Sequence, residues 1–418
     1  MTRIHIIGAG LAGLSAAVAV TQAGHVATLH ESGPAAGGRC RSYFDRELGC
    51  RIDNGNHLLL SGNRAALAYL ETIGAAGTLT GPAEPLFPFM DLATGERWIV
   101  APNAGRIPWW VFSRSRGVKG ARLADYLALL RLKLARPHHT VSETLSGAGT
   151  LYRRLLEPLA IAALNTMPDV ALVRLLAAVV DETLAQGGAA CRPLVPREGL
   201  SESFVDPALA WLAARGAVLH TNRRVAALHV DGGRVRRLQT TDGPTDIGPG
   251  EAVILAVPPW VATTLLPGLT APDAFESIVN LHFRAVADPR PTGFAGLVGG
   301  TAEWVFVKPG PTPETSIVST TTSAANRYAD LSADHLATLC WEDVCAALTL
   351  SGPRPPWRLV REKRATFAAT AYQERRRPGP RTSLSNLALA GDWTATGLPA
   401  TIEGAIRSGY TAAAVLLR

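Results

Sequence analysis

Three glycines near the N-terminus have the spacing of a backbone turn that can approach a phosphate. Gly8, Gly10 and Gly13 lie between a short apolar run at residues 3–7 and a run of small, apolar residues at 11–23. We expect a strand, a tight turn at Gly8 and then a helix. Gly10 would let a pyrophosphate reach the backbone, and Gly13 would let the helix pack closely on the strand. The spacing therefore predicts a dinucleotide site.

The residues that follow the turn support the same chemistry. Leu11 and Ala12 open the predicted helix, where free N–H groups attract phosphate. Residues 25–31 read as a second strand that ends in Glu31, with Ser32 next. A carboxylate at this place accepts hydrogen bonds from ribose hydroxyls and repels a 2′-phosphate, which argues against NADP. A glycine-rich turn without a ligand is the alternative.

Two further segments carry polar groups that a simple NAD dehydrogenase does not need. The first, Gly37-Gly38-Arg39-Cys40-Arg41, follows the second predicted strand, and ordinary surface charge is the alternative interpretation of its arginines. The second, Asp53-Asn54-Gly55-Asn56-His57, contains an imidazole, which can move a proton near neutral pH. A lone histidine is more often a structural hydrogen-bonding group, so both roles stay open for His57.

A second segment typical of nucleotide binding lies near the C-terminus. A predicted strand at 387–390 runs into Gly391 and Asp392, and a predicted helix at 401–417 follows Pro399 and Ala400. The carboxylate can accept a hydrogen bond from a ribityl hydroxyl or orient a pyrophosphate. The N–H groups at the helix start can stabilise negative charge on a reduced ring. Two distant nucleotide motifs in this order favour FAD over NAD.

These motifs, taken in order along the whole chain, resemble the flavin amine oxidase and phytoene desaturase superfamily. The resemblance implies that the arginine segment lies along the FAD pyrophosphate and flavin, and that the Asp-x-Gly segment passes the flavin ring. It also implies a backbone contact from a strand valine to adenine. The predicted FAD-binding residues are Gly8, Gly10, Leu11, Ala12, Gly13, Glu31, Ser32, Gly38, Arg39, Arg41, Gly55, Asn56, Val225, Ala256, Val257, Gly391, Asp392, Pro399, Ala400 and Thr401.

A closer resemblance is to the hydroxysqualene dehydroxylase family of bacterial hopanoid synthesis. It is carried by residues 53–57, 157–166 and 391–409, although family members commonly have Gln where this chain has Asn56. The family activity is reductive: hydroxysqualene loses its hydroxyl, receives a hydride from reduced FAD and becomes squalene. On this resemblance we predict three catalytic residues. His57, or a water that it holds, would supply the proton, and Asn165 and Thr166 could instead hold the hydroxyl.

Other functions fit the same motifs. A carotenoid-type desaturase or an amine oxidase would move the hydride from substrate to FAD. A non-catalytic flavin-binding protein could pass squalene precursors onward. The sequence has no second dinucleotide motif, so an external donor or a transient NAD(P)H encounter is as open as a built-in site for the reductant of FAD, and the oligomeric state is also open.

The order of the predicted elements indicates an α/β protein with a discontinuous Rossmann-like domain. The FAD-binding domain would comprise residues 1–75, 195–265 and 380–418. An inserted, mixed α+β substrate-binding domain would comprise 76–194 and 266–379. This is the amine oxidase-like architecture that the resemblance also implies.

Composition limits the remaining possibilities. The chain has 418 residues, of which 47% are hydrophobic and 18% charged, so it can bury a large core. Its net charge of +7 comes without a long basic tail, which makes a nucleic-acid partner a poor fit. The five cysteines include no CxxC pair, so neither a metal site nor a disulfide framework is indicated, and a cytoplasmic location is expected. We expect neither a signal peptide nor a membrane-spanning helix.

A C30 isoprenoid substrate would have to come from a bilayer or from the preceding enzyme. An aromatic segment at 108–112 and an apolar stripe at 120–136, with arginines around both, suit a peripheral contact with the inner face of the membrane. The alternative is equally open: these aromatics and leucines form core, and the arginines are a solvated face.

Overall fold

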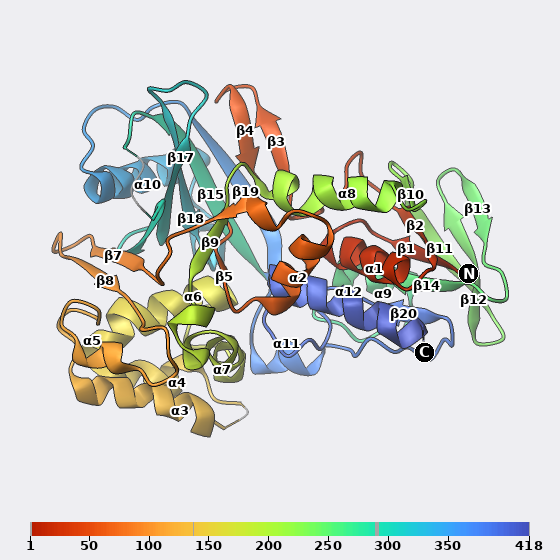
Figure 1. Ribbon diagram of the computed structural model, residues 1–418, viewed down its shortest axis with the longest axis horizontal. Coiled ribbons are helices and arrows are strands. Elements are labelled where there is room, and N and C mark those ends of the chain that lie inside the picture. The colour runs from red at the N-terminus through yellow and green to blue at the C-terminus, as the bar shows by residue number, and fades with distance from the viewer. Residues whose placement is uncertain (1, 137, 289–291, 418) are drawn as a thin grey trace.

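The computed structural model describes residues 2–136, 138–288 and 292–417. Figure 1 shows an elongated molecule. A parallel sheet with its helices and both chain termini lies at one end, and a larger sheet and a group of helices lie at the other. The α/β fold class predicted from the sequence is therefore confirmed. Among the described residues, no helix combines the length and apolar character needed to cross a membrane.

A five-stranded parallel sheet forms the first end. In spatial order, its strands are β10 (Val218–His220), β2 (Val26–His30), β1 (Arg3–Ile7), β14 (Ala252–Leu255) and β20 (Leu387–Leu389). Apart from β10, the strands of this sheet consist almost entirely of buried residues. This burial explains why their sequences are short apolar runs. The sheet takes strands from all three segments predicted for the FAD-binding domain, while the limits of the two domains stay a prediction.

Helices α1 (Leu11–Gln22) and α12 (Ile402–Leu416) bring the two ends of the chain together. The Ser15 hydroxyl donates to the Ile406 carbonyl oxygen over 3.1 Å. A β-carbon at Gly409 would lie 2.3 Å from the carbonyl oxygen of Ala12, so only glycine permits this approach. The C-terminal helix is therefore seated directly on the helix that follows the glycine turn.

Smaller elements surround the parallel sheet. They are α2 (Arg64–Thr72), α8 (Asp206–Ala213), α9 (Pro259–Leu265) and a three-stranded antiparallel sheet of β11 (Val225–Asp231), β12 (Arg234–Thr240) and β13 (Gly243–Asp246). Short pairings are made by β3 (Ser42–Asp45) with β4 (Cys50–Asp53), and by β9 (Pro193–Pro196) with β5 (Leu59–Leu60) and β6 (Leu79–Thr80).

A seven-stranded sheet dominates the other end. Its order is β19 (Trp357–Phe367), β15 (Phe275–Ala285), β18 (Ser316–Thr322), β17 (Trp304–Pro309), β16 (Phe294–Val298), β7 (Phe87–Asp91) and β8 (Arg97–Val100). Only the β16–β7 pair is parallel. Apolar side chains of this sheet form a separate core with α10 (Ala333–Leu348), and others, including Trp304 and Phe306, join the central cluster described below.

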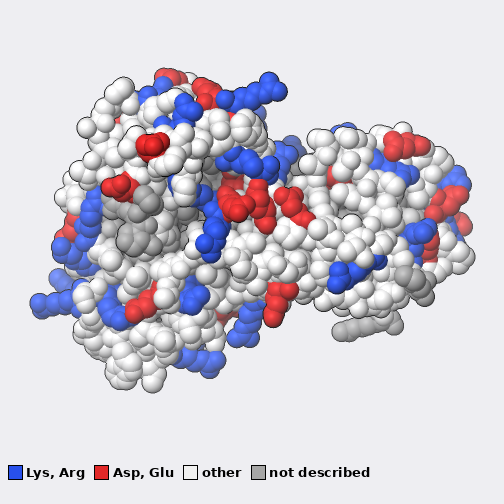
Figure 2. Space-filling view, turned by 45° about the horizontal axis from the view of Figure 1, so that its top comes forward, with Lys and Arg blue, Asp and Glu red and all other residues white. Residues whose placement is uncertain are grey.

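A helical group packs beside this sheet. It comprises α3 (Ala128–Leu134), α4 (Val141–Leu145), α5 (Gly149–Leu151), α6 (Glu157–Leu164) and α7 (Val173–Glu182), with α11 (Ala371–Arg375) nearer the parallel sheet. Figure 2 shows this helical end, at the lower left, as a mostly uncharged surface with Lys and Arg side chains along its border.

Three histidines are stacked on the parallel sheet. His5 Nδ1 and His30 Nε2 are 3.2 Å apart, and the rings of His30 and His220 are 5.7 Å apart. Burial, reinforced by the neighbouring His5 and Arg223, lowers the pKa of His30 to about 3, and burial also lowers the pKa of His5. These rings are therefore neutral at pH 7 in the folded protein.

This stack makes the folded protein sensitive to mild acid. Because the folded-state pKa of His30 is below the unfolded value, its contribution to stability is present above pH ~6.5 and is lost as the pH falls toward 3. We expect the free energy of unfolding to fall between pH 6.5 and 5, by at most about 1.4 kcal/mol per pH unit for each proton taken up. Denaturant titrations at several pH values measure this dependence. The free energy of unfolding should depend less steeply on pH in His30→Gln than in the wild type, and equally steeply in the exposed control His335→Gln. Equal slopes for all three proteins would contradict this account.

Candidate active site

The glycine turn between β1 and α1 is enclosed by its neighbours. Gly8 N donates to the His30 carbonyl oxygen over 2.8 Å. A β-carbon at Gly8 would lie 2.5 Å from the Ala256 carbonyl oxygen, and one at Gly13 would lie 1.9 Å from the Gly8 carbonyl oxygen. Both positions therefore require glycine. A β-carbon at Gly10 would meet nothing within 4 Å, so this backbone faces open space where a phosphate could approach.

The start of α1 has the character of an anion site. Its N-cap residue is Gly10, with no capping side chain, and the first turn contains no acidic residue. Leu14 N donates back to the Gly10 carbonyl oxygen, so the N–H groups of Leu11, Ala12 and Gly13 precede the first intrahelical bond. A helix of 12 residues presents its positive end here.

Glu31 lies beside the same turn. Its carboxylate accepts from Ala9 N over 2.9 Å and from Gly33 N over 2.7 Å, and the Ser32 hydroxyl donates to it over 3.3 Å. Each carboxylate oxygen can accept a further hydrogen bond. The side chain is therefore held in place by backbone amides and can still accept from a ribose.

The second glycine segment lies against the first. Gly37 N donates to the Ala9 carbonyl oxygen over 2.8 Å, and a β-carbon at Gly38 would be 3.4 Å from the Gly10 α-carbon. Arg41 is exposed and lines a surface cavity of about 680 Å³ together with Tyr43. The two glycine segments thus form one backbone surface, as the sequence interpretation requires.

Arg39 connects this surface to the C-terminal strand. Its Nη2 atom lies 2.7 Å from Asp392 Oδ2, and its Nη1 atom donates to the Ala365 carbonyl oxygen at the end of β19. Loss of hydration around this partly exposed side chain would lower the pKa of Arg39, but the carboxylates of Asp392 and, to a smaller extent, Glu362 outweigh it and raise the pKa. Two residues predicted independently from opposite ends of the sequence are therefore direct partners.

The segment after β20 closes over the end of β14. Trp393 Nε1 donates to the Val257 carbonyl oxygen over 2.9 Å, and the indole fills the space beneath Gly391, where a β-carbon would lie 2.3 Å from Nε1. Gly391 itself has φ near +148°, which few other residues adopt. Ala256 N donates to the Ile7 carbonyl oxygen, which places the β14 end beside the glycine turn.

Helix α12 begins where the sequence predicts. The Thr401 hydroxyl accepts from Gly404 N over 3.0 Å and caps the helix, directly after Pro399 and Ala400. In the first turn, the buried Glu403 carboxylate accepts from Ala65 N and Ala66 N at the start of α2. The start of α12 is thereby fixed relative to the parallel sheet.

The Asp-x-Gly segment lies between the two ends of the molecule. Asp53 accepts from Lys308 Nζ over 2.9 Å and from Leu200 N over 2.8 Å, and these contacts hold its pKa below the ordinary value against the effect of burial. Asn56 Nδ2 donates to the Thr321 hydroxyl over 3.1 Å.

Gly55, which precedes Asn56, also packs closely against the seven-stranded sheet. A β-carbon at Gly55 would lie 2.9 Å from Asn280 Nδ2, so this backbone lies directly against β15. The predicted flavin-passing segment is therefore attached to the seven-stranded sheet.

His57 is partly buried, and burial is the main reason why its pKa is lowered to about 4. The charges of Arg39 and Lys308 lower it further, whereas Asp53 opposes the shift. At pH 7 the ring is therefore neutral. A neutral ring can donate one hydrogen bond and accept another, and the proton-supplying role of His57, or of a water that it holds, stays a prediction.

Asn165 and Thr166 have protein partners for their polar atoms. Asn165, in the left-handed conformation at the end of α6, donates to the Thr366 hydroxyl over 2.9 Å and accepts from Ala324 N over 2.6 Å. The Thr166 hydroxyl donates to the Leu164 carbonyl oxygen and accepts from Ala369 N over 2.9 Å. Both are buried, so the geometry favours a positioning role over the predicted contact with a substrate hydroxyl.

Val225 is buried on β11 and paired with Thr240. Its backbone contact with adenine stays a prediction.

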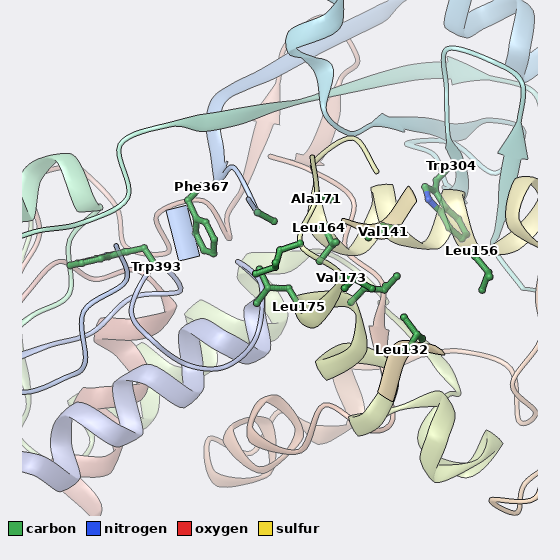
Figure 3. Close-up of a cluster of buried hydrophobic side chains, with 14 of the residues drawn as sticks. Leu132, Val141, Leu156, Leu164, Ala171, Val173, Leu175, Trp304, Phe367 and Trp393 are labelled. Atoms are coloured by element: carbon green, nitrogen blue, oxygen red, sulfur yellow. The ribbon is translucent and has the colours of Figure 1, made fainter. Parts of the chain in front are cut away.

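One apolar cluster connects the residues predicted to bind the flavin with the helical group. Figure 3 shows side chains of this cluster from Trp393 and Phe367, past Leu164, to Trp304 and Leu132. The same cluster includes Val253 and Leu255 of β14. The two ends of the molecule therefore share an apolar interior, which would suit a reaction that water interrupts.

Comparison with known proteins identifies the family of this chain. The chain matches the sequence profile of the family described as flavin containing amine oxidoreductase over residues 11–289 and 291–417. Two solved structures have a similar fold: an oxidoreductase from Methanosarcina mazei (TM-score 0.72, 14% identity, 98% of this chain and 99% of that one) and cyclohexylamine oxidase from Brevibacterium oxydans (TM-score 0.68, 16% identity, 99% and 98%). The protein is thus a flavin-dependent oxidoreductase of this family.

Full-length relatives narrow the assignment. The chain is 47% identical to hydroxysqualene dehydroxylase of Sinorhizobium fredii, over 99% of this chain and 98% of that protein. It is 44% identical to hydroxysqualene dehydroxylase of Zymomonas mobilis, over 100% and 99%. The chain belongs to the hydroxysqualene dehydroxylase family, as the motifs indicated.

The residues present fit FAD, the cofactor of the family. The open backbone at Gly10, the uncapped start of α1 and the Glu31 carboxylate suit a pyrophosphate and a ribose. Arg39, paired with Asp392, would lie along the same cofactor.

Sequence reasoning missed several residues that organise the site. Arg377 is buried and donates to the Asp392 carbonyl oxygen over 3.1 Å, and Lys308 pairs with Asp53. Asn280 holds the Asp-x-Gly segment, and Thr366 holds the end of α6 through Asn165. None of the four lies in a recognisable motif, because each acts on a partner that is distant in the sequence.

Gly10 offers a direct test of the cofactor site. Because a β-carbon there meets no protein atom, Gly10→Ala should fold with wild-type thermal stability. The added methyl group would nevertheless occupy the space predicted for the pyrophosphate, so we expect FAD affinity to fall at least about tenfold, a loss of about 1.4 kcal/mol. Fluorescence titration of the apoprotein with FAD measures this. Gly250→Ala, equally free of contacts, is the matched control, and wild-type affinity in Gly10→Ala would show that the cofactor lies elsewhere.

Proposed function

We propose that this protein removes the hydroxyl of hydroxysqualene reductively and releases squalene, in hopanoid synthesis. The observation that carries the proposal is identity of 44–47% to proteins named hydroxysqualene dehydroxylase over nearly the whole of each chain. Desaturases match a much smaller part: a probable zeta-carotene desaturase of Synechococcus elongatus is 37% identical over 73 residues, or 18% of this chain.

The reaction exchanges a C–O bond for a C–H bond. The substrate takes up one hydride and one proton, and water leaves. When bound and reduced, FAD supplies the hydride. Hydroxide is a poor leaving group, so the departing oxygen must be protonated. The protein therefore has to direct a proton to that oxygen and keep other water away from an allylic cation.

We assign His57 to the leaving hydroxyl as a neutral hydrogen-bonding ring. A pKa near 4 keeps the imidazole uncharged at pH 7, so the ring orients the hydroxyl, or a water that protonates it, and no imidazolium is required. Asn165 and Thr166 act as positioning residues that attach α6 to β19 and its C-terminal extension. The apolar cluster behind them excludes water from the cation.

The substrate and the electrons both come from outside the chain. A C30 isoprenoid alcohol partitions into bilayers, so we propose that the protein acts in the cytoplasm at the inner face of the membrane. An external donor re-reduces FAD after each turnover.

Anaerobic single turnover tests the direction of the reaction. The purified holoenzyme is photoreduced and mixed with hydroxysqualene while flavin absorbance is followed and products are extracted. Reoxidation with an equal amount of squalene is the expected result. No reoxidation, combined with bleaching of the oxidised enzyme by a polyprenoid hydrocarbon or an amine, would assign a desaturase or an oxidase instead. Bound FAD that responds to none of these compounds would indicate a flavin-binding carrier.

Substitution of His57 tests its role in the same assay. His57→Ala should lower the single-turnover rate by about 10²-fold with normal FAD content, and His57→Gln, which keeps a donor, should lower it less. Because the His57 pKa is near 4, the wild-type rate should not titrate with this residue between pH 6 and 8. A tenfold decline over that range that disappears in His57→Gln would contradict a neutral ring. The exposed His335→Ala is the control.

A further inference from the structure

The net charge of the protein is concentrated in one segment. Residues 106–136, here called the basic segment, contain eight Lys or Arg and one Asp, a net charge of +7. The whole chain has 41 Lys and Arg against 34 Asp and Glu, so the other residues hold 33 of each and are neutral in sum. This segment of 31 residues, about 7% of the chain, thus accounts for the entire net positive charge.

The basic segment also exposes large apolar side chains. It holds seven of the fourteen exposed large hydrophobic residues of the described chain: Ile107, Trp109, Phe112, Leu123, Leu127, Leu130 and Leu134. The four leucines recur every three or four residues along α3 and the turn before it, so they share one helical face. Leu134 is 83% exposed, and the opposite face buries Tyr126 and Leu132. The four leucines of the predicted stripe therefore face outward, whereas Tyr126 of the same stripe is core.

Most of the cations in the basic segment are not used within the protein. Arg116 and Lys119 lie 3.6 Å and 3.0 Å from carboxylates of Glu84 and Glu96. No ion pair within the described residues involves the others, which are Arg106, Arg114, Arg122, Arg131, Lys133 and Arg136. Figure 2 shows the corresponding end of the molecule as a mostly uncharged surface with Lys and Arg side chains, and a few acidic ones, along its border.

We propose that the basic segment docks on an anionic lipid bilayer. The exposed leucines and aromatics enter the boundary of the acyl chains, and the unpaired Arg and Lys side chains contact lipid phosphates. A merely solvated face explains the cations but leaves the apolar row unexplained. A second copy of the chain would cover the apolar row, but it would bring one +7 segment against another. An anionic bilayer satisfies both features.

The docking face would also serve substrate entry, and this part of the proposal rests on the proposed function. Trp110, Tyr126 and Leu132, on the inner side of the basic segment, belong to the apolar cluster that extends to Phe367 and Trp393 beside Asp392. A lipid alcohol that leaves the bilayer at this face therefore meets apolar side chains on the side toward the flavin-binding residues. Docking and substrate entry would then occur at one place.

Vesicle flotation of the FAD-loaded protein tests the docking face. We expect binding to vesicles of phosphatidylcholine mixed with phosphatidylglycerol, weaker binding to phosphatidylcholine alone, and loss of the difference at high salt. The triple variants Leu127→Ser/Leu130→Ser/Leu134→Ser and Arg131→Gln/Lys133→Gln/Arg136→Gln should each bind anionic vesicles about tenfold or more weakly. FAD content and thermal unfolding are measured for every variant, to show that each one is folded and loaded with FAD.

Matched controls separate the surface from general effects. Phe44→Ser/Val230→Ser removes exposed apolar side chains elsewhere, and Arg46→Gln/Arg236→Gln/Arg381→Gln removes three exposed cations elsewhere; both should bind vesicles as the wild type does. Equal losses in controls and triple variants would overturn the proposal, as would absence of vesicle binding by the wild type. Wild-type dimers that the leucine variant dissociates, without vesicle binding, would assign the face to self-association instead.

Failure of this proposal can be distinguished from failure of the proposed function. Vesicle binding does not require turnover. A protein that binds vesicles but leaves hydroxysqualene unchanged would therefore contradict the proposed function and not the docking face. If the function holds, the triple variants should turn over substrate in detergent micelles at the wild-type rate and lose about tenfold with substrate in anionic vesicles. Equal losses in both media would show that the basic segment does not act through the membrane.

Discussion

The guanidinium of Arg39 and the carboxylate of Asp392 lie 2.7 Å apart, although 353 positions separate them in the chain. Asp392 is buried, and a buried carboxylate without a partner is costly, so the two ends of the sequence must meet. The Arg39 side chain is 43% exposed, which limits what the pair adds to folding stability. Its main consequence is geometric: it fixes the second glycine segment, the end of β20 and the end of β19 around one point.

The rest of the structure is arranged about that point. Close packing of α12 on α1 through Gly409 holds the C-terminal segment on the parallel sheet. Lys308 and Asn280 attach the Asp-x-Gly segment to the seven-stranded sheet. The apolar cluster then extends from Trp393 to the helical group, where the basic segment faces solvent. The predicted cofactor site, the apolar interior and the exposed apolar face are consecutive parts of one arrangement, which would suit a water-insoluble substrate.

Local signals made much of this predictable. The glycine turn, Glu31, Gly391 and the Thr401 cap are encoded by neighbouring residues, and the structure places them as expected. The sequence also supplied Arg39 and Asp392, but not their pairing, because no periodicity links such distant positions. The roles of Asn165 and His57 depended on burial and on long-range partners, which a motif does not reveal. The stripe at 120–136 was ambiguous for a similar reason: helical spacing defines a face, but it does not tell whether that face meets core or solvent.

A double-mutant cycle on FAD affinity tests the central claim, that both ends of the chain build one flavin site through this ion pair. Arg39→Gln and Asp392→Asn should each weaken FAD binding, and the double variant should weaken it by at least about threefold less than the product of the single effects, since either change already breaks the pair. Single effects that multiply in the double variant would show that the two residues act independently. The flavin site would then not depend on their contact.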